Sequence, residues 1–422
     1  MISVLASLLM TIPSPTIAAL AIAAPAITTP TIASPAIAAP PRLTQESDRI
    51  AARTAWKYFE RNWDQKTGLV NSVDDLPWTT LWDQGSAMLG IHSAHQLGLI
   101  TETRFNQRIE TLLRTLETMP IPNTQLPNKA YDTETAEMLN LDFSPDPSGK
   151  SGWSALDMSR FLLGLHVLQA NYPKHHDRIH RIVDRWKISK LEKDGWLMGS
   201  VPEKGKLTLV QEGRLGYEQY AAESLKKWNI NATKAINNPP QTPIEIDGIT
   251  LNVDRRDFKN SGASNALTND PYFLWALELG LPKAAQTQVT NLMKLQEQRF
   301  QRTGILTAVN EDSLDRAPYF LYYGVLTDGS LWQPVTAHGR VSNLRFLSTK
   351  AAFAWKALMP GSRYGDRLRE AAQPLFDAKR GYFSGRYENS QDGINKAMNV
   401  NTNAIILESL LYQARGNRPI AH

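Results

Sequence analysis

The chain of 422 residues contains no cysteine, which excludes disulfide bonds, thiolate metal sites and cysteine nucleophiles. It also lacks a run of basic residues, because its 46 lysines and arginines are interspersed with 41 aspartates and glutamates. Nucleic acid is therefore not an expected partner, since binding it requires a concentrated basic patch. No phosphate-binding loop, dinucleotide fingerprint or serine nucleophile elbow is present, and we expect no cofactor.

The first 41 residues lack charged side chains, and from 21 to 40 they repeat a five-residue unit that ends in proline. Proline at this spacing excludes a long helix. The apolar run over 2–12 has the length of a signal-peptide core, and small residues at 21–23 and 36–38 fit cleavage sites, although no basic residue precedes the run. No stretch reaches the ~20 apolar residues of a membrane span, so no stable span is expected. We predict a signal-like or disordered segment over 1–41 and an exported protein, periplasmic or extracellular, with a misassigned start or an uncleaved anchor as alternatives.

From Thr44 onward, apolar residues recur at helical spacing, and β-branched alternation is nearly absent outside 244–253. Charged amphipathic segments alternate with segments of small and apolar residues, as expected of helices exposed on one side and helices buried nearly all round. The charged, outer helices are predicted over 44–63, with Thr44 as N-cap, and over 102–119, 174–191, a short 229–237, 282–300 and 363–378. The buried, inner helices are predicted over 81–98, 153–171, 215–228, 269–280, 341–359 and 399–415.

Twelve helices in this alternating order bury every apolar face if they close into a ring. We therefore predict an all-α fold, an (α/α)6 toroid, as one domain over 42–416, with a small β-hairpin insertion over 244–253 and a C-terminal tail over 417–422. Links from outer to inner helices are long, roughly 17 to 40 residues, whereas the reverse links are short. Long loops gathered at one mouth of a scaffold favour a functional site there. Glycine caps at the ends of outer helices are expected at Gly68, Gly195, Gly304 and Gly381.

Polar residues concentrate in the first turns of the inner helices, which are expected to converge at this mouth. They are Asp83, Asp157, Glu218, Asp270, Asn343, Asn401 and Asn403. Helix capping is the simplest alternative, since Asp and Asn favour helix N-termini. Aromatic rings accompany the acids, however, and a sugar-binding cleft combines polar groups for hydroxyls with flat rings for C–H faces. These rings are Trp82, Trp153, Tyr217 and Tyr272.

The long loops add further candidates, for most of which a solvated surface charge is the alternative. They are Tyr131, Asp132, Glu134, Glu137, Glu212, Glu311, Asp312, Asp315, Tyr319 and Trp332. In the segment 212–218, Arg214 could hold either Glu212 or Glu218 ionised while burial keeps the other protonated. That division of protonation states is the one that an acid–base pair needs.

Two other groups of polar residues favour a structural interpretation. His176 and His180 lie four residues apart on a charged outer helix but lack a third ligand, so no metal site is expected. The run DRRD over 254–257 is most simply a solvated turn.

Several motifs along the chain together resemble one protein family. They are WDQGS at 82–86, LPNKAYDT at 126–133, EGRLGYEQYAA at 212–222 and STKAAFAW at 348–355. Over nearly its whole length after residue 45, the chain resembles the bacterial domain of unknown function 3131. That family is similar to the glucoamylase-like toroids, which include enzymes acting on β-1,2-glucans. The resemblance implies a toroid and a carbohydrate substrate, and it assigns no catalytic residue.

The predicted function is an exported glycoside hydrolase or transglycosylase acting on an envelope or extracellular glucan, so the expected partner is an oligo- or polysaccharide. Glycoside hydrolysis needs two carboxyl groups in opposed protonation states, and a wide funnel favours the inverting separation of ~6.5–9.5 Å. The acid is predicted as Glu212 or Glu218, and the base as Asp83, Asp157 or Asp270. A catalytically silent glycan-binding or envelope-organising protein is the main alternative, and the acid-rich mouth argues against a polysaccharide lyase. The predicted substrate-binding residues are Trp82, Tyr131, Asp132, Trp153, Arg214, Tyr217, Tyr272, Asp315, Tyr319 and Trp332.

Overall fold

The computed structural model describes residues 41–421, except 263–264, 337–338 and 342. The signal-like segment predicted over 1–41 therefore lies, apart from Pro41, outside the described residues. Residues Pro40–His422 group into one compact unit. Among the residues that the structure describes, no helix is long and apolar enough to cross a membrane.

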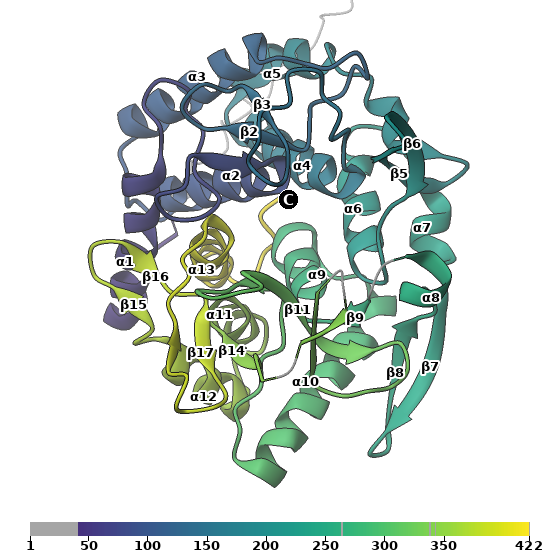
Figure 1. Cartoon of the computed structure of the whole chain (residues 1–422). Helices are drawn as coiled ribbons and strands as arrows, with labels where there is room; N and C mark the ends of the chain where they lie inside the picture. Colours follow the sequence, from purple (N-terminus) through teal and green to yellow (C-terminus); the bar gives the residue numbers. More distant parts are fainter. Residues whose placement is uncertain (1–40, 263–264, 337–338, 342, 422) are drawn as a thin grey trace, which may run out of the picture. The chain divides into compact units, whose positions relative to one another are not determined.

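Six helical segments of the described chain form a closed inner ring, which can be followed in Figure 1. Each contacts the next in chain order, and the last contacts the first. In that order they are α2 (Leu81–Gln96), α4 (Ala155–Asn171), α6 (Tyr217–Lys226), α9 (Asp270–Leu274) with the π-helical turn η3 (Trp275–Leu279), α11 (Thr349–Leu358) and α13 (Val400–Ala414). This cycle is the arrangement that the toroid prediction requires, and it places α4 and α11 opposite each other.

A second set of helices alternates with the inner ones along the chain. They are α1 (Glu46–Asn62), α3 (Glu102–Thr118), α5 (His176–Val183) flanked by η1 (Pro173–His175) and η2 (Ile188–Leu191), α7 (Thr233–Asn237), α10 (Lys283–Thr303) and α12 (Arg363–Ala372). Contacts join α1 and α3 to α2, α5 to α4, α7 to α6 and α12 to α11. Each of these helices therefore covers the outside of the inner ring or of the loops attached to it.

The inner helices begin at residues that suit a buried helix start. Thr80, Ser154, Ser348 and Asn399 are N-caps whose side chains accept a backbone N–H from the first turn. Close packing of α2 against α4 depends on Gly85, because a Cβ there would lie 2.7 Å from the backbone of Arg160. The end of the ring at which the inner helices begin is called the mouth below.

Several predicted boundaries differ from the structure. The N-cap of α1 is Gln45 rather than Thr44, and it makes no side-chain cap bond. The fifth inner helix begins at Thr349, so Asn343 lies in an exposed loop with φ 66° instead of a first helical turn. Of the four predicted glycine caps, only Gly304 directly follows a helix, α10, in a left-handed conformation. The other three, Gly68, Gly195 and Gly381, lie in turns or at a strand start.

The predicted mostly helical fold is confirmed, but the loops contain more strands than the predicted hairpin. That hairpin pairs β7 (Gln241–Ile246) with β8 (Ile249–Asp254), and it precedes the short α8 (Phe258–Ser261). The other small antiparallel sheets lie in the links that lead into inner helices. Two of them have three strands each: β1 (Trp78–Thr80), β2 (Ala130–Asp132) and β3 (Met138–Leu139) in the first, and β4 (Glu192–Lys193), β5 (Trp196–Glu203) and β6 (Lys206–Gln211) in the second. A five-stranded sheet contains β9 (Ala266–Leu267), β10 (Asp312–Ser313), β11 (Phe320–Leu326), β12 (Gln333–Thr336) and β13 (Gly339–Arg340). The last two sheets are β14 (Phe346–Ser348), β17 (Gly385–Tyr387) and β18 (Ile394–Asn395), and the pair β15 (Phe376–Asp377) with β16 (Gly381–Tyr382).

Candidate functional site

Glu311 lies at the mouth, in the link that leads from α10 to α11. The hydroxyl of Tyr217, the first residue of α6, donates to Glu311 Oε2 at 2.6 Å. The preceding side chain, Asn310, donates from Nδ2 to Oδ1 of Asp270, the first residue of α9, at 3.0 Å. One short segment thus connects the starts of two inner helices and places a carboxyl group between them.

The next residue, Asp312, extends this connection to the other two helices on that side. Its Oδ1 accepts from Nδ2 of Asn399, the N-cap of α13, at 2.9 Å, and its Oδ2 accepts from the hydroxyl of Ser348, the N-cap of α11, at 3.1 Å. Asp312 is 1% exposed, so its role is structural. The segment 310–312 is therefore fixed by contacts with four inner helices.

The environment of Glu311 favours its protonated form. Burial, followed by the negative charge of Asp270, raises the pKa of Glu311 to about 8, while Lys350 limits the rise. Lys350 Nζ lies 2.8 Å from Asp270 Oδ1, and both side chains are almost fully buried. Glu311 itself keeps part of its surface accessible. It is therefore a carboxylic acid at neutral pH that remains within reach of solvent.

Asp157 and Glu212 form a second acidic group beside the start of α4. Burial, followed by the negative charges of Glu212 and Asp83, raises the pKa of Asp157 to about 7. Glu212 Oε2 accepts the backbone N–H of Ala155 at 2.5 Å, and burial raises the pKa of Glu212 as well. Both side chains remain partly accessible. Glu311 contacts the start of α6, which is the neighbour of α4 in the ring, so this group and Glu311 lie at adjoining parts of the mouth.

Asp83 is held by neighbouring polar groups. Its Oδ1 accepts from Asn401 Nδ2 at 2.7 Å, its Oδ2 accepts from the hydroxyl of Thr80 at 2.8 Å, and Ser72 also donates to Oδ2. The side chain is 7% exposed. These contacts fix Asp83 in place and use both of its oxygens.

Three aromatic rings accompany the two acidic groups. The rings of Trp82 and Tyr217 lie 6.2 Å apart between centroids. Tyr322 on β11 is partly exposed, and its pKa is raised by burial and then by the charges of Glu311 and Asp157. Because the charges of Glu311 and Asp157 both affect the pKa of Tyr322, its ring lies near both carboxyl groups. The mouth therefore combines carboxyl groups of raised pKa with flat apolar surfaces, and a sugar site requires both polar groups and such surfaces.

Glu218, the other predicted acid, belongs to a buried ion-pair cluster. Arg256 donates from Nη2 to Glu218 Oε1 at 2.6 Å and to Asp254 Oδ2 at 2.6 Å, and Glu218 is 0% exposed. Two members of the run 254–257, Asp254 and Arg256, therefore belong to this cluster and not to the predicted solvated turn, whereas Arg255 is exposed. Arg214, expected to pair with Glu212 or Glu218, donates instead to the carbonyl of Gly213 and the hydroxyl of Ser261. The charge partner of Glu218 is Arg256, which lies three positions after the predicted hairpin and was not predicted to pair with Glu218.

Most of the predicted stacking rings are buried. Tyr131, Trp153, Tyr272 and Trp332 are between 1% and 8% exposed, whereas Tyr319 is 68% exposed. Trp153 donates from its indole to the carbonyl of Met198 at 3.0 Å, and the ring of Trp332 lies 5.3 Å from the guanidinium of Arg299. These contacts make the buried rings part of the scaffold.

The remaining predicted residues have local contacts. Asp132 Oδ1 accepts the backbone N–H groups of Glu134 and Thr135 in a turn. Asp315 accepts from the hydroxyl of Tyr387 at 2.8 Å and from the backbone N–H of Lys396 at 2.9 Å. Asp270 is 1% exposed and paired with Lys350, as described above. Within the described part of the chain, no group of three or more acidic or histidine side chains could hold a metal ion.

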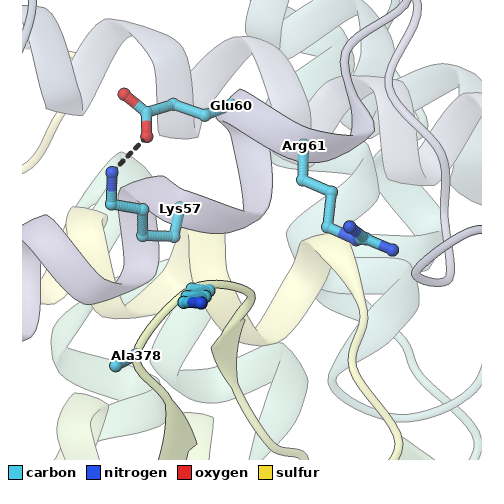
Figure 2. Close-up of a pocket in the computed structure, with 5 residues that line it drawn as sticks. Lys57, Glu60, Arg61 and Ala378 are labelled. Atoms are coloured by element: carbon cyan, nitrogen blue, oxygen red, sulfur yellow. Dashed lines mark hydrogen bonds and ion pairs between the residues drawn. The ribbon is translucent and has the colours of Figure 1, made fainter.

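A pocket of about 500 Å³ lies between α1 and the turn that joins β15 to β16, lined by Lys57, Glu60, Arg61, Ala378 and Lys379 (Figure 2). Lys57 Nζ donates to Glu60 Oε2 at 2.6 Å, so the single carboxyl group in this pocket is already paired. The pocket has no aromatic ring. It offers neither the acid pair nor the stacking surface found at the mouth.

Comparison with solved structures shows that the chain shares its fold with several proteins over most of its length. A protein from Bacteroides fragilis named as a glucoamylase has a TM-score of 0.61 at 12% identity, covering 92% of this chain and 97% of that one. An endo-β-1,2-glucanase from Chitinophaga pinensis, in complex with sophorotriose and glucose, also has a TM-score of 0.61 at 12% identity, covering 89% and 96%. An endo-β-1,2-glucanase from Talaromyces funiculosus, in complex with β-1,2-glucan, has a TM-score of 0.54 at 10% identity, covering 88% and 84%.

Comparison with curated protein sequences finds no match. A family profile described as "Protein of unknown function (DUF3131)" matches residues 50–416, which is most of the chain and contains the whole mouth. The resemblance inferred from the sequence motifs is thereby confirmed, and the chain belongs to the DUF3131 family.

Proposed function

We propose that the protein is an exported glycoside hydrolase or transglycosylase that acts on an envelope or extracellular glucan. The observation that supports this most directly is the placement of Glu311 and Asp157, two partly accessible residues with pKa values of about 8 and about 7, at one mouth, where the charges of both act on Tyr322. Glycoside hydrolysis needs one protonated and one ionised carboxyl group, and the higher pKa of Glu311 favours its protonated form while Asp157 is the more readily ionised of the two.

In the proposed reaction Glu311 is the general acid. It gives its proton to the glycosidic oxygen as the bond to the anomeric carbon breaks, while the ionised Asp157 takes a proton from the water whose oxygen attacks that carbon. In transglycosylation a sugar hydroxyl replaces that water. The sequence predicts Glu212 or Glu218 as the acid. Glu311 is assigned in their place, because Glu218 is 0% exposed and paired with Arg256, and Glu212 lies beside Asp157 and accepts the backbone N–H of Ala155.

The two pKa values define the expected pH dependence. Asp157 must be ionised, which requires a pH above about 7, and Glu311 must be protonated, which requires a pH below about 8. A bell-shaped profile of kcat/KM with its maximum between these values is expected.

The test is release of reducing sugar from a panel of purified glucans. Linear β-1,2-glucan is the first to try, because two of the similar structures are named as endo-β-1,2-glucanases. Glu311→Gln and Asp157→Asn should each lower kcat by ~10²-fold or more, as expected when general acid or base catalysis is lost. Glu370→Gln, an exposed glutamate on α12, is the matched control and should retain full activity. If a glucan is bound but none is cleaved, the glycan-binding alternative replaces this proposal.

Export is part of the proposal and rests on the signal-like segment over 1–41. Fusing residues 1–45 to alkaline phosphatase, which needs disulfides and so folds only outside the bacterial cytoplasm, should give an active fusion. The same fusion without residues 1–41 should be inactive. Equal activity of the two would contradict export through this segment.

A further inference from the structure

The exposed large hydrophobic side chains are distributed unevenly. Among the described residues, eight of the nine lie in links that lead from an outer helix into an inner one, and the ninth, Ile50, is on α1. Single exposed apolar residues are common, but their concentration at one end of a molecule indicates a contact surface. The eight are Leu141, Phe143, Val201, Leu209, Phe258, Ile305, Tyr319 and Phe320.

Two exposed aromatic pairs stand out within this set. Phe143 is 52% exposed in the link that leads to α4, and its ring lies edge-on to Trp78 with centroids 5.3 Å apart. Phe320 is 43% exposed on β11, and its ring lies edge-on to Tyr322 at 5.4 Å. Phe143 lies just after β3 and Phe320 lies on β11, and Figure 1 shows these two strands on opposite sides of the ring centre.

The second pair continues towards the acids. Tyr322 lies near Glu311, and the carboxyl group of Glu311 accepts a hydrogen bond from the hydroxyl of Tyr217. The ring of Tyr217 in turn lies beside that of Trp82. The rings thus alternate with carboxyl and hydroxyl groups and do not merge into one apolar area. A protein partner would need a broad, continuous contact of roughly 800 Å². Alternating rings and polar groups instead suit sugars, which present C–H faces and hydroxyls.

We infer that Trp78–Phe143 and Phe320–Tyr322 are two sugar-binding platforms for one extended glucan chain, which passes over Asp157 and Glu311 between them. The inference rests on the proposed function and adds the substrate class: an internal stretch of a polysaccharide, with chain extending beyond the acids on both sides. Cleavage within the chain follows, because neither end needs to enter the mouth.

The test compares the variants Phe143→Ala and Phe320→Ala with a control variant, Ile50→Ala. The control also removes an exposed hydrophobic side chain, but from α1 and not from a link at the mouth. On linear β-1,2-glucan each platform variant should raise the KM about five- to tenfold, on the scale of one lost ring contact. Their KM and kcat on sophorotriose should change less than on the polymer, because a trisaccharide bound across the acids extends less far on either side, and wild type should release mixed oligosaccharides from the polymer first. Equal losses on both substrates, no loss on the polymer, or release of a single small sugar from a chain end would overturn the inference.

A binding measurement separates this inference from the proposed chemistry. In native gels containing β-1,2-glucan, Glu311→Gln should be retarded, and adding Phe143→Ala or Phe320→Ala should restore much of the mobility. If wild type cleaves no glucan but this pattern appears, the enzymatic proposal fails and the platforms stand. If all of these variants migrate alike, the platforms are refuted whether or not the protein cleaves glucan.

Discussion

The hydroxyl of Tyr217 donates a hydrogen bond of 2.6 Å to Oε2 of Glu311. It joins the first residue of α6 to the segment that leads into α11, although the two residues are 94 positions apart in the chain. This bond stabilises the ionised form of Glu311 and so moderates the rise in its pKa that burial and Asp270 cause.

Replacing Tyr217 by phenylalanine should therefore raise the pKa of Glu311 further. The alkaline limb of the kcat/KM profile should move to higher pH, and kcat should fall by up to about tenfold because the carboxyl group loses a positioning contact of ~1 kcal/mol. Tyr412→Phe, at the far end of α13, should leave the profile unchanged. A shift of the limb to lower pH would contradict the assignment of Glu311 as the acid.

The raised pKa of Glu311 also predicts how stability depends on pH. The folded protein holds this proton more tightly than the unfolded chain, so the stabilisation from Glu311 is complete below about pH 4.5 and is lost as the pH rises through about 8. Glu311→Gln should therefore lose less stability than wild type between pH 6 and pH 9. Thermal unfolding of both proteins across that range measures the difference, with Glu370→Gln as the control. Parallel curves for Glu311→Gln and wild type would show that Glu311 ionises normally in the folded state.

Arg256 is predicted to support the fold through Glu218 and Asp254. Its guanidinium contacts both carboxylates at 2.6 Å, and both carboxylate side chains are 0% exposed. Arg256→Met should lower the free energy of unfolding by about 3 kcal/mol, because it leaves two buried charges without a partner. Urea denaturation measures this loss, and the exposed neighbour in Arg255→Met should show almost none. If both variants lowered the free energy of unfolding equally, the contact of Arg256 with Glu218 and Asp254 would not be a buried ion pair that supports the fold.

At the centre of the inner ring, Arg160 of α4 lies between two buried glutamates. Its Nη1 donates to Glu278 Oε1 at 2.6 Å, and its Nη2 is 3.5 Å from Glu408 Oε1. Burial, followed by the charge of Glu278, raises the pKa of Glu408 well above its usual value, which favours the uncharged form of Glu408 in the folded protein. Arg160→Met should cost about 3–5 kcal/mol of stability, whereas Glu408→Gln should be nearly neutral because it replaces one uncharged group by another. A large loss for Glu408→Gln would show that Glu408 is ionised.

Much of the helical scaffold could be predicted because its signal is local. Segments such as Ala155–Asn171 are apolar on all sides, and segments such as Glu102–Thr118 are charged on one face, so the burial of each helix is visible in its own residues. Short strands have no such signal, since two or three residues show no period. Their partners are also distant: Phe346–Ser348 pairs with Gly385–Tyr387.

The candidate site was predicted less completely. Glu212, Asp157 and Tyr217 were named because helix starts and loop ends are recognisable, and Glu311 was named only among many loop acids. No local pattern indicates that Arg256 pairs with Glu218, that Lys350 pairs with Asp270, or that Tyr322 lies near Glu311. Arg256 lies 38 positions from Glu218, and its partnership depends on how the β7–β8 hairpin folds back.

The sequence by itself determined the periodic features of this protein: which helices are buried, in what order they alternate, and at which end the long loops gather. These follow from side-chain polarity along each helix, and they hold whatever the neighbouring segments do. Only the tertiary structure decided which carboxyl groups are protonated. A pKa depends on burial and on charges brought within a few ångströms, and for Glu311 those come from Asp270, Lys350 and Tyr217, on three other helices.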